Sequence, residues 1–201
     1  MGWLRLQAVA AVLVLVAAAG VSHGFEFKEA TVEAIHLGFT NGSLTSEALV
    51  QFYLDQISRL NQLLHAVIEV NPDALPQARA ADARRKTAGG RLIGALDGVP
   101  VLLKDNIATR DKLNTTVGSF ALLGSVVRRD AGVVTKLRRA GAVVLGKANP
   151  TEWCSIRAVR DGWSARGGQS LVIKLVLTCA ENQLYFDFLF ENRYSARDPL
   201  I

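Results

Sequence analysis

The sequence is poor in the residues that build metal centres and disulfide frameworks. Its 201 residues include two cysteines and three histidines. Cys154 and Cys179 show no CxxC spacing and have no neighbouring histidines, so we expect neither a metal site nor another cofactor. The two thiols could form one disulfide in an oxidising compartment or stay buried in a reducing one, and the sequence leaves both alternatives open.

The sequence also lacks a strongly basic or acidic stretch. Lysine and arginine number 23 against 18 acidic residues, and no aromatic residues alternate with the basic ones. This pattern argues against a nucleic-acid partner and favours a solvated surface. Since 50% of the residues are hydrophobic, the chain can bury the core of one domain. The arginines fall in scattered pairs at 84–85, 128–129 and 138–139.

One long apolar run is present, at the N-terminus. Arg5 precedes the run Ala8–Val21, and small residues follow it. The run is shorter than the roughly 20 residues that a membrane-spanning helix needs. The segment 1–24 is therefore predicted to be a secretory signal peptide, cleaved between Ala19 and Phe25, whose removal leaves no membrane span.

Two N-glycosylation sequons agree with a secreted protein. Asn41 lies in Asn-Gly-Ser and Asn114 lies in Asn-Thr-Thr. Such acceptor sites are used in the secretory pathway. We therefore expect glycans on both asparagines and a location in the secretory pathway or outside the cell.

The first part of the globular region reads as helix, helix, strand and helix. A helix is predicted from a cap at Thr31 to the stretch 40–42, where asparagine and glycine suit a left-handed terminus. A second helix, capped by Thr45 or Ser46, shows apolar residues at helical spacing. A short strand is expected in 66–71 and an alanine- and arginine-rich helix in 72–90. The apolar stripe of the second helix comprises Leu49, Phe52, Tyr53, Ile57 and Leu60.

The next part alternates strands with a helix. The apolar run 99–105 predicts a buried strand, 115–124 a loop, 131–142 a helix and 143–147 a second strand. This order is typical of an α/β fold, in which helices cover both faces of the sheet. Loops at strand ends are where such folds place their sites.

Lys104 directly follows the apolar run of the first of these strands, in "GVPVLLKDNI". Its ammonium could reach water along the strand end, as surface lysines commonly do. Alternatively, burial could disfavour the charged form and give a neutral amine that accepts a proton from a serine hydroxyl. The ten residues alone do not separate these alternatives.

The surrounding sequence resembles the amidase signature family of serine hydrolases, plant amidases and peptide-amidase-like members in particular. The similarity covers about residues 26–169, as separate blocks in one order. It implies an α/β fold with a mixed sheet covered by helices, and an N-terminal part of an amidase domain at 25–169. The blocks are "GALDGVPVLLKDNI", "TTVGS", "DAGVVTKLRRAGAVVLGKANPTEW" and "GWSARGGQ".

The resemblance also implies a chemistry. In that family the lysine after the "GVPV" strand is the general base of a Ser, cis-Ser, Lys triad that hydrolyses C–N amide bonds, which assigns this role to Lys104. It implies a small amide or a peptide amide as substrate. It places Trp153, Cys154 and Ser155 at the lip of the substrate pocket, although Trp153 could equally be a core aromatic.

After Gln169 the sequence departs from the family pattern. The family's two catalytic serines and oxyanion loop lie in a Gly/Ser-rich stretch, whereas residues 170–201 contain no glycine. We therefore expect a truncated isoform that is catalytically inactive and that ends in a divergent tail at 170–201. Ser119, Ser155 and Ser164 could in principle replace the nucleophile, but loop serines of this kind are interpreted as turn residues. The alternatives are a non-catalytic secreted binding or regulatory protein and an unstable fragment.

Overall fold

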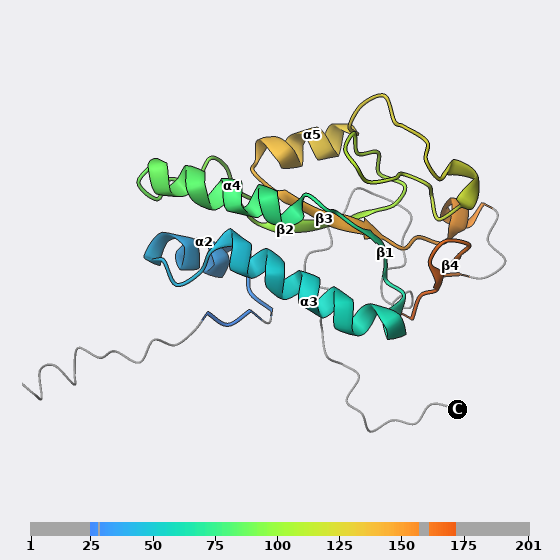
Figure 1. Ribbon diagram of the computed structural model, residues 1–201, viewed down its shortest axis with the longest axis horizontal. Coiled ribbons are helices and arrows are strands. Elements are labelled where there is room, and N and C mark those ends of the chain that lie inside the picture. Colours follow the sequence, from blue (N-terminus) through green and yellow to red (C-terminus); the bar gives the residue numbers. More distant parts are fainter. Residues whose placement is uncertain (1–24, 28, 157–160, 172–201) are drawn as a thin grey trace, which may run out of the picture.

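The computed structural model describes residues 25–27, 29–156 and 161–171 (Figure 1). The predicted signal peptide and nearly all of the tail lie outside these residues, so the domain limits at 24 and 169 stay predictions. No helix within the described residues has both the length and the apolar character needed to cross a bilayer.

Both N-terminal helices begin at their predicted caps, and the first also ends where asparagine and glycine predicted. Helix α2 spans Val32–Asn41, with the Thr31 side chain accepting from the Ala34 amide and Gly42 at φ 76°. Helix α3 spans Ser46–Leu64, with the Thr45 side chain accepting from the Ala48 amide. Both N-caps satisfy an amide that the first helical turn leaves without a partner.

The remaining elements follow the predicted order. Strand β1 (Val67–Val70) leads into helix α4 (Ala74–Thr87), and strand β2 (Pro100–Lys104) is followed by a long loop. Helix α5 (Gly132–Arg139) then precedes strand β3 (Val143–Ala148). The loop contains the short 3₁₀ helix η1, and a second one, η2, follows β3 before the hairpin β4–β5. The ranges of these short elements are Phe120–Leu122, Glu152–Ser155, Trp163–Ser164 and Gly168–Gln169.

The central sheet is mixed and has the order β1-β3-β2. Strands β2 and β3 run parallel, as expected for a strand–helix–strand connection, and β1 pairs with β3 in the antiparallel sense. The prediction of a mixed sheet is confirmed.

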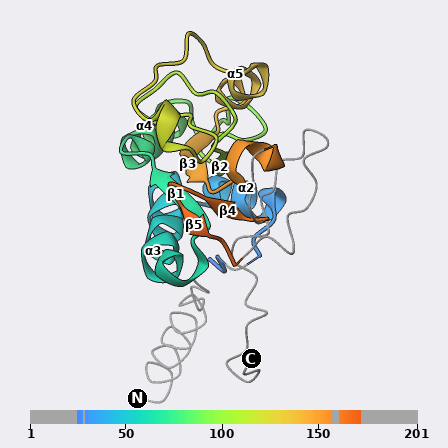
Figure 2. The ribbon, with the colours of Figure 1, turned by 90° about the vertical axis from the view of Figure 1, so that its right-hand side faces the viewer.

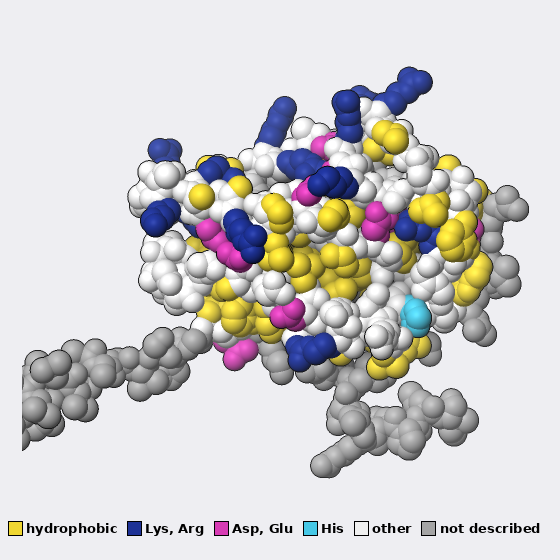
Figure 3. All heavy atoms as spheres, in the orientation of Figure 1, with side chains coloured by type: hydrophobic (Ala, Val, Ile, Leu, Met, Phe, Trp, Pro, Cys, Tyr) yellow, Lys and Arg dark blue, Asp and Glu magenta, His cyan; other side chains and the backbone are white. Residues whose placement is uncertain are grey.

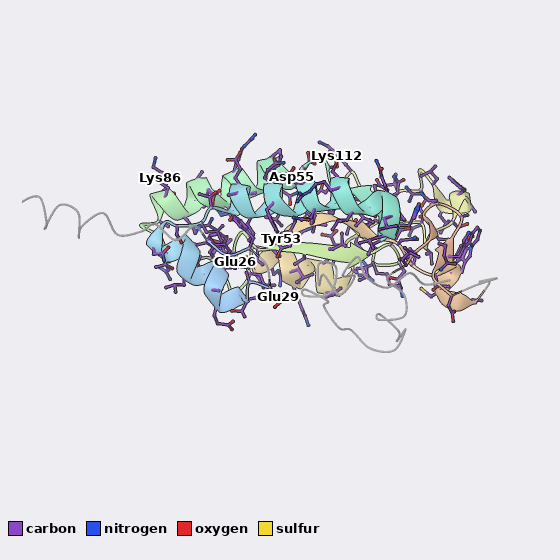
Figure 4. All side chains as sticks on the ribbon, turned by 90° about the horizontal axis from the view of Figure 1, so that it is seen from below. Glu26, Glu29, Tyr53, Asp55, Lys86 and Lys112 are labelled. Carbon is purple, nitrogen blue, oxygen red and sulfur yellow. The ribbon has the colours of Figure 1, made fainter. Side chains whose placement is uncertain are left out.

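Helices cover both faces of this sheet. Alternate residues of β3 point to opposite faces, so that each face offers side chains for a helix to pack against. Val143 and Leu145 pack against α3 and α4 on one face, and Val144 packs against α5 on the other. Figure 2 shows α5 and α3 on opposite sides of the strands. Tyr53 of α3 lies in the layer between helix and sheet and packs against the residues of two core clusters (Figure 4).

The distribution of charge on the face seen in Figure 3 agrees with the sequence. Lysine and arginine side chains are scattered and lie among acidic ones, with hydrophobic side chains between them. No continuous basic stripe crosses the part of the described chain seen on this face.

A buried carboxylate fixes the beginning of β2. Asp97 has no exposed surface, and its side chain accepts from Arg84 Nη2 at 3.0 Å and from Arg85 Nη1 at 3.4 Å. The guanidinium of Arg85 also donates to Ser46 Oγ at 2.6 Å and to Asp82, and it lies 4.1 Å from the Phe39 ring centroid. One buried ion network therefore joins α2, α3 and α4 to the turn before β2.

We predict that Asp97→Asn lowers the free energy of unfolding by about 2–4 kcal/mol, because it leaves the buried Arg85 with less compensating charge. Urea unfolding followed by circular dichroism measures this. The matched control is Lys112→Ala, which breaks an exposed ion pair with Asp73 and should change stability by at most about 1 kcal/mol. Equal effects of the two substitutions would contradict the structural role given to Asp97.

Candidate active site

Lys104 is the last residue of β2 and lies at the carboxyl end of the parallel pair β2–β3. Its Cα pairs with that of Ala148, and its carbonyl accepts from the Ile107 amide at 2.9 Å. The residue is half-buried. It is therefore neither fully exposed, as a lysine that reaches water would be, nor fully buried, as a desolvated neutral amine would be. Ligands of open α/β sheets bind at this edge.

The next residue, Asp105, carries a carboxylate with no exposed surface. It accepts from the Thr116 amide at 3.2 Å, from the Thr116 hydroxyl, and from the Gly118 amide at 2.9 Å. The Asp105 carbonyl accepts from the Val117 amide at 3.2 Å. Residues 116–118 are therefore folded around Asp105, and they fix the loop that follows Lys104.

Arg166 connects this loop to β1. Its Nη1 donates to Thr116 Oγ1 at 2.9 Å and lies 3.9 Å from Asp105 Oδ2. Its Nη2 donates to Glu69 Oε2 at 3.1 Å. The other Glu69 oxygen, Oε1, accepts from the Asn114 amide at 3.1 Å and from Asn114 Nδ2 at 2.9 Å. Two acidic side chains and one guanidinium thus form a continuous network.

This network is not evident from the sequence, although three of its members lie within the motifs quoted above. Asp105 belongs to "GVPVLLKDNI", Thr116 to "TTVGS" and Arg166 to "GWSARGGQ". The acidic residue directly after the candidate base, at the end of an apolar run, was a signal visible in the sequence. The partners could not be found in this way, because 97 positions separate Arg166 from Glu69.

Lys147 is a second lysine at a strand end, and its burial is not evident from the sequence. It follows the apolar run of β3 as Lys104 follows that of β2, and it has no exposed surface. Its Nζ donates to the Ile107 carbonyl at 2.6 Å and to Thr115 Oγ1 at 3.0 Å. Burial lowers the pKa of Lys147 to about 8, against the opposing effect of nearby carboxylates, Asp105 first among them.

The predicted pocket residues lie beside the loop that Asp105 organises. The Trp153 amide donates to the Val117 carbonyl at 3.0 Å, and Asn106 Nδ2 lies 3.2 Å from Cys154 Sγ. Both Trp153 and Cys154 have φ 51°, a left-handed backbone that is costly for such residues and is concentrated at functional sites. Element η2 ends at Ser155. The structure thus brings this segment to the Lys104 end of the sheet, and its role in substrate binding stays a prediction.

Trp153 is half-buried, and none of the described core clusters includes it. Cys154 forms no disulfide with any described residue, while Cys179 lies outside them. The pairing of the two cysteines therefore stays open. Within the described ranges, no group of histidine, cysteine and acidic side chains could hold a metal ion.

The described loop serines have structural hydrogen bonds. Ser119 Oγ accepts from the Ala121 amide at 3.4 Å and caps η1. Ser164, with no exposed surface, donates to Asn149 Oδ1 at 2.6 Å and accepts from the Gly167 amide at 2.9 Å. These contacts support the interpretation of Ser119 as a turn residue, whereas Ser164 belongs to strand β4.

We predict that the protein gains stability from Lys147 as the pH rises from about 8 to about 10.5. The unfolded lysine, with its ordinary pKa near 10.5, binds more protons in this range than the folded one, so the free energy of unfolding increases with pH. The change should reach about 3 kcal/mol at most. The difference in urea stability between the wild type and Lys147→Met, measured from pH 7 to 10.5, reports it, since titration of all other groups cancels. A difference that is flat across this range would refute the prediction.

Comparison with known proteins identifies the family of this chain. The family model Amidase matches residues 48–160, more than half of the chain. A protein of Arabidopsis thaliana described as a probable amidase is 58% identical over 151 residues, which cover 74% of this chain and 30% of that protein. The chain therefore spans about a third of the length of such relatives.

Solved structures give the same result. The native peptide amidase from Stenotrophomonas maltophilia is 46% identical, with a TM-score of 0.66 over 73% of this chain and 30% of that one. An amidase family protein from Bacillus anthracis is 34% identical, with a TM-score of 0.66 over 71% of this chain and 29% of that one. Sequence motifs, sheet topology and these similarities agree, and this chain belongs to the amidase signature family.

Proposed function

We propose that this protein carries the lysine part of an amide-hydrolysing site, with Lys104 as general base toward a small amide or a peptide amide. The observation that carries the proposal is the position of Lys104 at the carboxyl end of β2, followed at once by a loop held by the buried Asp105. A base acts only when it is held within reach of the proton that it accepts.

The chemistry requires a proton relay. A serine hydroxyl is a weak nucleophile until a base removes its proton, and a neutral lysine amine can do so. The serine attacks the amide carbonyl, backbone amides stabilise the resulting oxyanion, and the proton passes to the leaving amine as the C–N bond breaks and an acyl-serine remains. Water then hydrolyses the acyl-serine, which releases the acid and restores the serine hydroxyl. Lys104 would accept the serine proton in the first step, pass it to the leaving amine, and act as base again toward the attacking water.

We further propose that the chain of 201 residues does not itself turn over amides. The described loop serines Ser119 and Ser164 are engaged in structural hydrogen bonds, and residues 170–201 contain no Gly/Ser-rich stretch. Without a nucleophile and an oxyanion hole, most of the rate enhancement of a serine hydrolase is lost.

The test separates these two proposals. The purified chain and its Lys104→Ala variant should show the same background rate on a peptide amide. In a chimera that replaces the matching segment of the Stenotrophomonas peptide amidase with residues 25–169, hydrolysis should return, and Lys104→Ala should reduce kcat by about 10³-fold or more.

The matched control in the chimera is Lys86→Ala, which removes an exposed lysine of α4 (Figure 4) and should leave kcat unchanged. An active chimera that tolerates Lys104→Ala would refute the role of Lys104. Turnover by the 201-residue chain that disappears in its own Lys104→Ala variant would refute its inactivity.

We also propose that the protein enters the secretory pathway and is glycosylated at Asn41. Asn41 is exposed, and its contact within the described part of the chain is through Oδ1, which accepts from the Ser43 amide at 2.9 Å. Asn114 differs, because its Nδ2 donates to both Glu69 oxygens and its Oδ1 accepts from Gly124. A glycan on Asn114 Nδ2 would disturb these hydrogen bonds to Glu69, so the proposal assigns a glycan to Asn41 and none to Asn114.

We predict that the protein, secreted from a eukaryotic host, begins between residues 19 and 25 and carries a glycan on Asn41 but none on Asn114. Peptide mapping by mass spectrometry before and after glycan removal measures both. Asn41→Gln should be secreted without a glycan. A mature chain that begins at Met1, or a glycan on Asn114, would contradict the proposal.

A further inference from the structure

Arg166 reaches three separate parts of the chain although its side chain is only 11% exposed. Its Nη2 donates to Glu69 of β1, its Nη1 donates to Thr116 of the loop, and the same Nη1 lies 3.9 Å from the carboxylate of Asp105 at the end of β2. The Arg166 amide donates to the Gly118 carbonyl at 3.0 Å. The main chain and the side chain of Arg166 therefore both donate hydrogen bonds to the same loop.

The Asp105 carboxylate already accepts hydrogen bonds from neighbours other than Arg166. The Asp105 carboxylate receives two amides and one hydroxyl from Thr116 and Gly118. The guanidinium therefore adds compensating charge and a mechanical link from the loop to Glu69. Only a forked, planar cation can donate to Thr116 and Glu69 from different nitrogens, and a lysine ammonium presents one nitrogen alone.

The link also fixes the hairpin β4–β5 on the loop. Gly118 has φ +77°, and a Cβ there would lie 2.5 Å from the Cβ of Ser164. This close approach lets the segment that carries Arg166 pack directly on the backbone of the loop after Lys104. At such a position glycine is required both by its backbone angle and by the space.

We propose that Arg166 is a positioning residue, whose guanidinium holds the loop 105–118 and with it Lys104 in register with the hairpin β4–β5. The inference rests on the proposed function of Lys104, since it names the residue that keeps this base in place. It assigns to Arg166 no contact with a substrate.

The test uses hydrogen exchange on the 201-residue chain. The amides of Thr116, Val117 and Gly118 all donate to Asp105, so they report whether the loop is held. In Arg166→Gly their exchange should accelerate about tenfold or more, while amides of Val144 and Leu145 in the core change by less than about twofold. Added methylguanidinium should restore the slow exchange in Arg166→Gly, because it refills the vacated space with the same planar cation.

Arg166→Lys guards against a variant that fails to fold, since it keeps the positive charge. Its loop amides should still exchange faster than wild type, because an ammonium cannot span both partners. The matched control is Arg91→Lys, at an exposed arginine before β2, which should change nothing. Dilute acetic anhydride at one pH gives the ratio of the acetylation rates of Lys104 and Lys86. This ratio should change threefold or more in Arg166→Lys and keep its wild-type value in Arg91→Lys.

Three results would overturn the inference. They are equal acceleration of loop and core amides, wild-type exchange in Arg166→Lys, and an unchanged labelling ratio of Lys104. None of these measurements depends on amide turnover, so the inference can fail while the Lys104→Ala result in the chimera still supports the proposed function, and the reverse is equally distinguishable.

Discussion

The fully buried carboxylate of Asp105 is the charge on which this end of the molecule depends. A carboxylate without exposed surface is stable only if donors and positive charge replace water. Thr116, Gly118 and Arg166 supply them, and this requirement dictates the path of the loop. Val117 adopts φ 54°, which is unusual for a β-branched residue. It is held there because its amide bonds to the Asp105 carbonyl and its own carbonyl to the Trp153 amide.

A buried aspartate paired with arginine lies at each end of β2. Asp97 precedes the strand and Asp105 follows it, and both are fully buried. The first is paired with arginines of α4, and the second is paired with Arg166 of the hairpin segment. Apolar packing of Val101 and Leu103 fixes the strand sideways, whereas the two charge networks fix it lengthwise, since each network requires a particular geometry. Lys104, at the end of a strand held in this way, has little freedom in the position of its backbone.

The sequence predicted what depends on neighbours along the chain. Thr31 and Thr45 predicted the beginnings of their helices, because a cap acts within one turn. Apolar runs predicted β2 and β3. It did not predict what depends on contacts between distant residues. The register shift in β1 between Val67 and Glu69 is such a feature, because a bulge changes the direction of side chains without altering the strand pattern. The convergence of Glu69, Thr116 and Arg166 could be seen only in the folded chain.

The two strand-end lysines show why burial and pKa alone do not identify a base. Lys147 is buried and its pKa is lowered to about 8, which is the profile sought in a catalytic amine. Its Nζ, however, donates to the carbonyl of Ile107 and the hydroxyl of Thr115, both of which belong to the loop after Lys104. A base must be reachable by its substrate, and Lys147 has no exposed surface, whereas Lys104 retains some. The perturbed lysine therefore supports the loop, and the proposal of a general base rests on the partly exposed Lys104.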